Sequence, residues 1–210
     1  MTPIIAPSIL AADFARLADA ADAVGSDADW LHIDVMDYHF VPNLTIGLPV
    51  VQSLRQASDL PFDCHLMITD PQLWALGYAE ASEDPVALAK VLRSAGSLAG
   101  LAIDRDTLVE PYLDLLPSFD TLLIMTIKAG FGGQEFLPEM LDKVRTARRH
   151  ASAGHLQLRI EVDGGIGEDT IAAAAEAGAD AFVAGTAVYD AADPAEACRR
   201  LRALVTPATA

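Results

Sequence analysis

The chain has 210 residues, of which 52% are hydrophobic and 21% charged, and this is enough for one domain with a buried core. Only 14 Lys and Arg residues stand against 30 Asp and Glu residues, so the formal net charge of −16 disfavours binding to nucleic acid or to an anionic membrane. The two cysteines, Cys64 and Cys198, are far apart and indicate neither a disulfide framework nor a thiolate metal cluster.

Short apolar runs alternate with longer stretches of helical spacing along the chain. Strands are predicted at residues 4–10, 30–36, 61–68, 98–103, 121–127, 157–163 and 181–184. Helices are predicted at residues 13–24, 49–57, 85–95, 137–150 and 168–177, the first capped by Asp13 and the last ended by Gly178. This α/β alternation is typical of parallel βαβ units, as found in a compact (β/α)8 barrel or in a seven-stranded open sheet.

The segment between the third and fourth runs decides between these two folds. An eighth strand would lie near residues 75–81, which leaves room only for a very short third helix near residues 71–74. Without a low-complexity linker or a break in composition, we expect one domain over residues 1–210, with a flexible tail at roughly residues 205–210.

Polar residues cluster at the carboxyl ends of three predicted strands. Side chains alternate along a strand, so His32, Asp34 and Met36 share one face, His65 shares a face with Met67, and Asp163 ends a later strand. In an α/β barrel these ends converge on one mouth, and His32, Asp34, His65 and Asp163 would there form a site suited to Zn²⁺, Fe²⁺, Mn²⁺ or Co²⁺. The alternative is that the histidines are hydrogen-bonded core residues and the aspartates cap loops.

Glycine-rich loops follow three of the predicted strands. They are Gly130, Phe131, Gly132 and Gly133; Gly164 and Gly165; and Gly185 with Thr186. Glycines in such loops let backbone N–H groups approach an anion, and barrels often hold phosphate with their last loops. One Gly-Gly pair is usually a plain turn, but three consecutive loops indicate a phosphate site that needs no Lys or Arg.

Several motifs, taken in order, resemble the ribulose-phosphate 3-epimerase family. They run from about residue 4 to residue 189: Ala6-Pro-Ser-Ile-Leu-Ala-Ala-Asp-Phe14, His32-Ile-Asp-Val-Met-Asp37, Phe40-Val-Pro-Asn43, His65-Leu-Met67, Gly130-Phe-Gly-Gly133, Val162-Asp-Gly-Gly165 and Val183-Ala-Gly-Thr186. Each motif alone is weak, whereas their order and spacing are specific.

This resemblance implies a TIM (β/α)8 barrel, in which the short spacing of this sequence leaves a shortened third helix and fourth strand. It implies one divalent metal ion on His32, Asp34, His65 and Asp163, with Asp34 and Asp163 as the two acid/base groups on opposite faces of the substrate. The reaction would be epimerisation of D-ribulose 5-phosphate to D-xylulose 5-phosphate at C3 through an enediolate. The resemblance also implies the following substrate contacts: Ser8, His65, Gly130, Phe131, Gly132, Gly133, Asp163, Gly164, Gly165, Gly185 and Thr186. Met36, Met67 and Met125 match the family's apolar cushion, although they could equally be ordinary core residues.

Two stretches depart from the family's usual pattern. Residues 69–83 are contracted, and Lys128-Ala129 replaces an Asn-Pro before the glycine loop. Lys128 raises the alternative of a Schiff-base aldolase, but strand parity places it on the face opposite Met125. An orotidine-phosphate type of decarboxylase would carry a lysine between its aspartates, and residues 32–37 contain none. The same residues would also suit an epimerase of a hexulose 6-phosphate or a tetrulose phosphate, or a noncatalytic sugar-phosphate-binding barrel.

The expected partner is therefore a small-molecule sugar phosphate. The first residues lack a basic segment, and no apolar run approaches the roughly 18 residues that span a bilayer, so we expect a cytoplasmic protein without a membrane partner. Barrels of this kind commonly form homo-oligomers, but no residue pattern here marks an interface.

Overall fold

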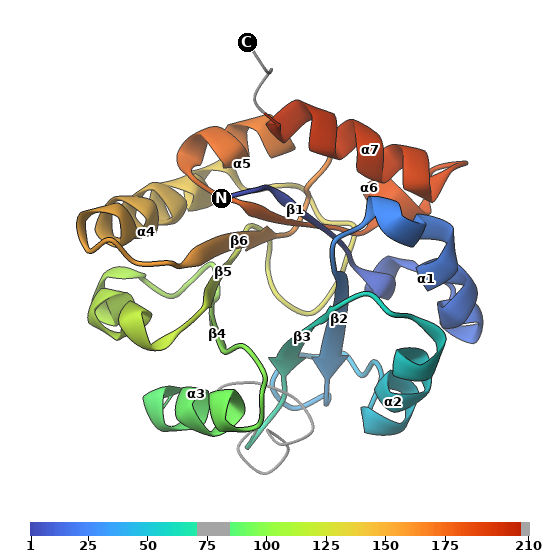
Figure 1. Cartoon of the computed structure of the whole chain (residues 1–210), viewed down its shortest axis with the longest axis horizontal. Coiled ribbons are helices and arrows are strands. Elements are labelled where there is room, and N and C mark those ends of the chain that lie inside the picture. The colour runs from blue at the N-terminus through green and yellow to red at the C-terminus, as the bar shows by residue number, and fades with distance from the viewer. Residues whose placement is uncertain (71–84, 207–210) are drawn as a thin grey trace.

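The computed structural model describes residues 1–70 and 85–206. Short parallel strands form the centre and helices lie around them (Figure 1). The strands are β1 (Ile4–Pro7), β2 (Leu31–Met36), β3 (Phe62–Met67), β4 (Gly100–Ile103), β5 (Thr121–Met125), β6 (Arg159–Asp163) and β7 (Ala181–Ala184). The α-helices are α1 (Leu17–Val24), α2 (Leu48–Ala57), α3 (Pro85–Ser94), α4 (Leu141–Ala153), α5 (Ile171–Ala177), α6 (Thr186–Tyr189) and α7 (Pro194–Val205).

All described strand pairs are parallel. Five strands pair in the order β1-β7-β6-β5-β4, and β2 pairs with β3. An isolated parallel bridge between Ser8 and His32 joins the end of β1 to β2. The carboxyl ends of the strands therefore lie at one end of the molecule.

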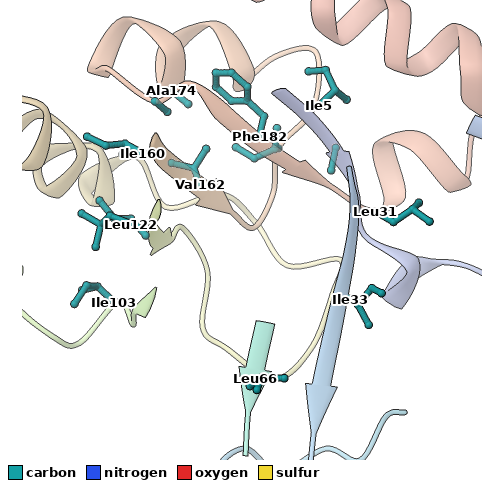
Figure 2. Close-up of a cluster of buried hydrophobic side chains, with 14 of the residues drawn as sticks. Ile5, Leu31, Ile33, Leu66, Ile103, Leu122, Ile160, Val162, Ala174 and Phe182 are labelled. Carbon is teal, nitrogen blue, oxygen red and sulfur yellow. The ribbon is translucent and has the colours of Figure 1, made fainter. Parts of the chain in front are cut away.

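The outer faces of the strands make the main hydrophobic core. Figure 2 shows Ile33 on β2, Leu122 on β5 and Phe182 on β7 pointing away from the centre of the strands. They are buried together with one stripe of each covering helix, such as Leu141, Val144, Ala147 and Ala151 on α4. Because side chains alternate, the residues in between face inward, and there the apolar residues form separate clusters around Met36 and Met67 and around Leu123 and Met125.

The seven predicted strands are confirmed, with shorter ends. The first ends at Pro7 rather than at residue 10, because the Ser8 side chain accepts a hydrogen bond from the Leu10 N–H and begins a 3₁₀ turn at Ile9–Ala11. The predicted helix at residues 137–150 begins with the 3₁₀ turn Pro138–Met140 and continues as α4. As predicted, Asp13 accepts a hydrogen bond from the Ala15 N–H, and Gly178 ends α5 with a φ of 111°.

Several helical segments are additional to the predicted set. The 3₁₀ helix Glu110–Ser118 lies between β4 and β5, and α7 follows α6, with the Asp193 side chain accepting a hydrogen bond from the Glu196 N–H. Asp193 followed by Pro194 is a recognisable helix start in the sequence. The predicted eighth strand at 75–81 and short helix at 71–74 lie outside the described residues, as do the contracted stretch from 71 onward and the tail beyond 206.

Candidate active site

Register between neighbouring strands stacks the inward-facing polar residues in two layers. Asp34 on β2 stands opposite His65 on β3, and one step below, His32 stands opposite Asp63. On the other side, Met125 on β5 stands opposite Asp163 on β6. Asp34, His65 and Asp163 thus form a layer near the carboxyl ends of the strands.

The four predicted metal ligands converge as expected. Single ligand atoms of His32, Asp34, His65 and Asp163 all lie within 4.8 Å of one another. The Asp34 Oδ1 atom is 3.4 Å from both His32 Nε2 and His65 Nδ1. The Asp163 Oδ2 atom is 3.8 Å from His32 Nε2 and 4.0 Å from His65 Nδ1. Two imidazoles and two carboxylates at this spacing could hold a metal ion.

The His32 ring supports this interpretation. Its Nδ1 atom donates a hydrogen bond to Asp63 Oδ2 at 2.5 Å, whereas its Nε2 atom is fully buried and, in the described part of the chain, has no hydrogen-bond partner. Burial by itself lowers the pKa of His32, but the charges of Asp34 and Asp63 outweigh it and raise the pKa well above 6.5. Without a cation the cluster therefore favours a proton on this ring, and a divalent cation would replace that proton.

Asp34 and Asp163 differ in protonation although they face the same space. Burial alone raises the pKa of Asp34, but the charge of His32 beside it outweighs burial and holds the pKa far below 3.8. The Ser8 hydroxyl also donates a hydrogen bond of 2.8 Å to Asp34 Oδ2. Burial and then the Asp34 charge raise the pKa of Asp163 to about 6. One carboxyl is thus held ionised, and the other can carry a proton near neutral pH.

Two carboxyl groups in the layer of His32, the partly buried Asp63 and the buried Glu161, were absent from the predicted site. Asp63 contacts His32 Nδ1, and Glu161, of which 1% is exposed, has its Oε1 atom 3.9 Å from the same nitrogen. Burial and the Asp63 charge raise the pKa of Glu161 well above its ordinary value. Strand parity could have found both, because Asp63 and Glu161 stand two residues before His65 and Asp163.

A cavity opens beside Asp34 and Asp163 at the carboxyl ends of the strands. Apart from His65, every predicted substrate contact and cushion residue lines it: Ser8, Met36, Met67, Met125, Gly130, Phe131, Gly132, Gly133, Asp163, Gly164, Gly165, Gly185 and Thr186. His65 is not part of this lining and instead contacts Asp34. Gln134 and Ile166 also line the cavity and were not predicted. The three glycine loops are therefore brought together around one space.

Close contacts shape the glycine loops. Gly164 has a φ of 121°, and a Cβ atom placed on it would lie 2.3 Å from Ile127 Cγ1, so only glycine fits without rearrangement. The Thr126 hydroxyl donates a hydrogen bond of 2.6 Å to the Gly164 carbonyl, which ties β5 to this loop. The Asn43 side chain donates one of 2.8 Å to the Gly130 carbonyl.

Lys128 lies outside this cavity. Strand β5 ends at Met125, which lines the cavity, whereas Lys128 is exposed and does not line it. The strand thus ends before Lys128, so the predicted parity does not extend to this residue. Lys128 lines a neighbouring cavity with His65, Met67 and Met125, and neither Asp34 nor Asp163 lines that cavity. The geometry disfavours the aldolase alternative.

Comparison with known proteins identifies close relatives. The family described as "Ribulose-phosphate 3 epimerase family" matches residues 4–189. The chain is 60% identical to the ribulose-phosphate 3-epimerase of Mycobacterium leprae, over 96% of this chain and 95% of that protein. It is 44% identical to the Escherichia coli protein of the same name, over 89% of each chain. It is 43% identical to the cytoplasmic isoform of Oryza sativa, over 94% of this chain and 92% of that protein.

Solved structures with the same fold are more distant in sequence. The 3-keto-L-gulonate-6-phosphate decarboxylase of Vibrio cholerae has a TM-score of 0.70 at 17% identity, and 98% of each chain is covered. A 3-hexulose-6-phosphate synthase has a TM-score of 0.69 at 20% identity, with 97% of this chain and all of that chain covered. The chain shares the TIM (β/α)8 barrel fold with these enzymes.

Proposed function

Because the chain belongs to the ribulose-phosphate 3-epimerase family, we propose that it catalyses the epimerisation of D-ribulose 5-phosphate to D-xylulose 5-phosphate at C3, with Asp34 and Asp163 transferring the protons. The observation that carries the roles of these residues is their convergence beside one cavity with opposite pKa shifts. Inversion at the carbon next to a ketone requires loss of a proton on one face and its return on the other, and two such carboxyls suit this chemistry.

We assign one divalent metal ion, Zn²⁺, Fe²⁺, Mn²⁺ or Co²⁺, to His32, Asp34, His65 and Asp163. The donor set suits these ions, and the buried His32 Nε2 atom without a hydrogen-bond partner in the described residues fits a ligand position. When bound, the ion would supply Lewis-acid stabilisation of the negative charge that develops on the substrate oxygens.

The two aspartates divide the proton transfer. Asp34 is held ionised by His32, so its carboxylate takes the C3 proton from one face and leaves an enediolate. Asp163, whose pKa is raised to about 6, delivers its own proton to C3 from the other face. After this step Asp34 is protonated and Asp163 is ionised. In the reverse reaction Asp163 takes the proton and Asp34 delivers one.

The glycine loops hold the phosphate in this proposal. Backbone N–H groups of Gly132, Gly133, Gly165 and Gly185 line the same cavity as the aspartates and would bind an anion without the help of a cationic side chain. The Ser8 hydroxyl at the end of β1 keeps Asp34 in place and lines the cavity, so it lies within reach of the sugar.

Proton NMR of D-ribulose 5-phosphate in D₂O tests the activity and the metal together. The purified chain is reconstituted in turn with Zn²⁺, Fe²⁺, Mn²⁺ and Co²⁺. We expect metal-dependent entry of deuterium at C3 and the appearance of xylulose 5-phosphate. If neither exchange nor product forms with any of these ions, the proposal is wrong, and the same exchange with hexulose 6-phosphates and tetrulose phosphates tests the alternative substrates. Binding of these substrates without exchange would indicate a noncatalytic sugar-phosphate-binding protein.

None of the helices in residues 1–70 and 85–206 has the length and hydrophobicity that crossing a bilayer requires. The cytoplasmic location, the homo-oligomer and the single domain over residues 1–210 stay predictions. Cell fractionation and light scattering of the purified chain would test the first two.

A further inference from the structure

We propose that Asp63, supported by Glu161, is a positioning residue that fixes the His32 ring so that its Nε2 atom faces Asp34 and Asp163. This inference rests on the proposed function, because it assigns His32 Nε2 to the metal. It concerns residues that lie in the layer of His32, below Asp34, His65 and Asp163, and do not line the cavity.

The first support is that the two ring nitrogens of His32 contact different groups. Asp63 Oδ2 lies 2.5 Å from Nδ1, while Nε2 lies 3.4 Å from Asp34 Oδ1 and 3.8 Å from Asp163 Oδ2. A carboxylate accepts hydrogen bonds, so the hydrogen of the ring stays on Nδ1 when Nε2 serves as a ligand. A metal-binding histidine needs such a partner for its second nitrogen, because that partner sets both the tautomer and the orientation of the ring.

The second support is the strand register. His32 and Asp63 are direct partners in the parallel pairing of β2 and β3, as Asp34 and His65 are one step above. The pairing therefore holds Asp63 beside the ring through the backbone of both strands. His32 is fully buried, so no water competes with the carboxylate for Nδ1.

Glu161 supports Asp63 from the opposite wall. It is buried on β6, shares a face with Asp163, and its Oε1 atom lies 3.9 Å from His32 Nδ1, the ring nitrogen that Asp63 contacts. Glu161 and Asp63 thus both lie on the Nδ1 side of the His32 ring.

A second cation bound by His32, Asp63 and Glu161 is the competing interpretation. Their ligand atoms also lie within 4.8 Å of one another. The 2.5 Å contact between Nδ1 and Asp63 Oδ2 already uses one ligand atom of His32 and one of Asp63 in a hydrogen bond. A hydrogen-bonded pair beside Glu161 therefore describes this group better than a metal site does.

Metal affinity tests the inference directly. The full chain is stripped of metal with a chelator and titrated with Co²⁺, and binding is followed by visible absorption. We expect Asp63→Ala to bind Co²⁺ about 10–100-fold more weakly than the unaltered chain and with an altered absorption spectrum. Asp63→Asn should recover part of the affinity, because its amide oxygen can still accept a hydrogen bond from Nδ1. The matched control is Asp142→Ala on exposed α4, which should change neither affinity nor spectrum.

Glu161 provides a second pair of variants if Asp63→Ala does not fold, as judged by circular dichroism. Glu161→Gln keeps a polar side chain of the same length beside the His32 ring, so it should bind Co²⁺ more tightly than Glu161→Ala. Equal affinities and spectra across the variants that fold would overturn the inference and leave the proposed metal site standing. Failure of the unaltered chain to bind Co²⁺ would instead remove the metal site and this inference together, while exchange of the C3 proton would remain a separate test of the activity.

Discussion

Acidic residues at the two ends of the strands have different partners. At the amino ends, aspartates are paired with arginines: Asp180 lies 2.7 Å from Arg148, and Asp29 lies 2.9 Å from Arg202. At the carboxyl ends, Asp34 and Asp163 face histidines, and no lysine or arginine of residues 1–70 and 85–206 forms an ion pair with either.

This difference separates stability from function. At the amino ends a guanidinium compensates each carboxylate, and the pairs hold loops and helices against the strands. At the carboxyl ends, burial and then the charge of Asp34 raise the pKa of Asp163, and a cation or a transferred proton would compensate this excess of carboxyl groups. Four changes to the chain or to its conditions would break or sharpen this contrast, from the largest expected effect to the smallest.

Removal of a carboxylate at the carboxyl ends should affect the reaction and leave the fold intact. Asp34→Asn or Asp163→Asn should lower kcat by roughly 10²–10⁴-fold, because an amide cannot take or deliver the C3 proton. The melting temperature of Asp163→Asn should stay constant or rise, since its repulsion with the Asp34 charge is relieved. Steady-state kinetics and thermal circular dichroism measure the two effects. Full activity in either variant would contradict the two-aspartate assignment.

Substitution of a glycine in a loop at the same end should lower both the stability of the fold and phosphate binding. Gly164→Ala should cost about 2–4 kcal/mol of stability, because its Cβ would overlap the Ile127 side chain at a positive φ. Urea denaturation measures the loss, and phosphate binding should weaken with it. Gly167→Ala is the matched control, because its Cβ would lie at an ordinary 3.6 Å from Ala187. Similar stabilities of the two variants would show that the loop can rearrange.

Stability should depend on pH through Asp163. Burial and the Asp34 charge raise its pKa from 3.8 to about 6, so between these values the folded chain holds a proton that the unfolded chain has lost. The free energy of unfolding of the metal-free chain should therefore fall as the pH rises from about 4 to about 6, by at most about 3 kcal/mol. Urea titrations should show a flatter dependence for Asp163→Asn, and parallel curves would refute the assignment.

Substitution of an arginine at the amino ends should lower stability and leave the reaction rate unchanged. Arg148 donates hydrogen bonds to the Gly178 carbonyl and to Asp180 Oδ2, so Arg148→Ala should lower stability by about 1–2 kcal/mol. The rate of epimerisation should stay unchanged, because the residue does not line the cavity. Measuring both in one preparation completes the contrast with Asp34→Asn. A large loss of activity without a loss of stability would overturn it.

Much of the site could be predicted because alternation along a strand is local. The positions of His32 and Asp34, two residues apart, require that both face the same way, and glycines after three strands indicate loops that approach an anion. Those inferences needed no knowledge of neighbouring strands, and the structure places ligand atoms of His32, Asp34, His65 and Asp163 within 4.8 Å of one another.

The roles of Asp63 and Glu161 could not be predicted in the same way. Each stands two residues before a predicted ligand, so strand parity predicts that its side chain faces inward. Its hydrogen-bond partner, however, depends on the register between neighbouring strands. Only the pairing of β2 with β3 places Asp63 opposite His32, and only the position of β6 brings Glu161 within 3.9 Å of that ring.

The sequence by itself determined the alternation of elements, the inward face of each strand and the set of residues able to bind a metal. The tertiary structure alone decided which carboxyl is ionised and which ring nitrogen faces the cluster. The physical reason is that strand parity is a property of the local backbone, whereas a pKa and a hydrogen bond depend on burial and on charges brought from distant segments of the chain.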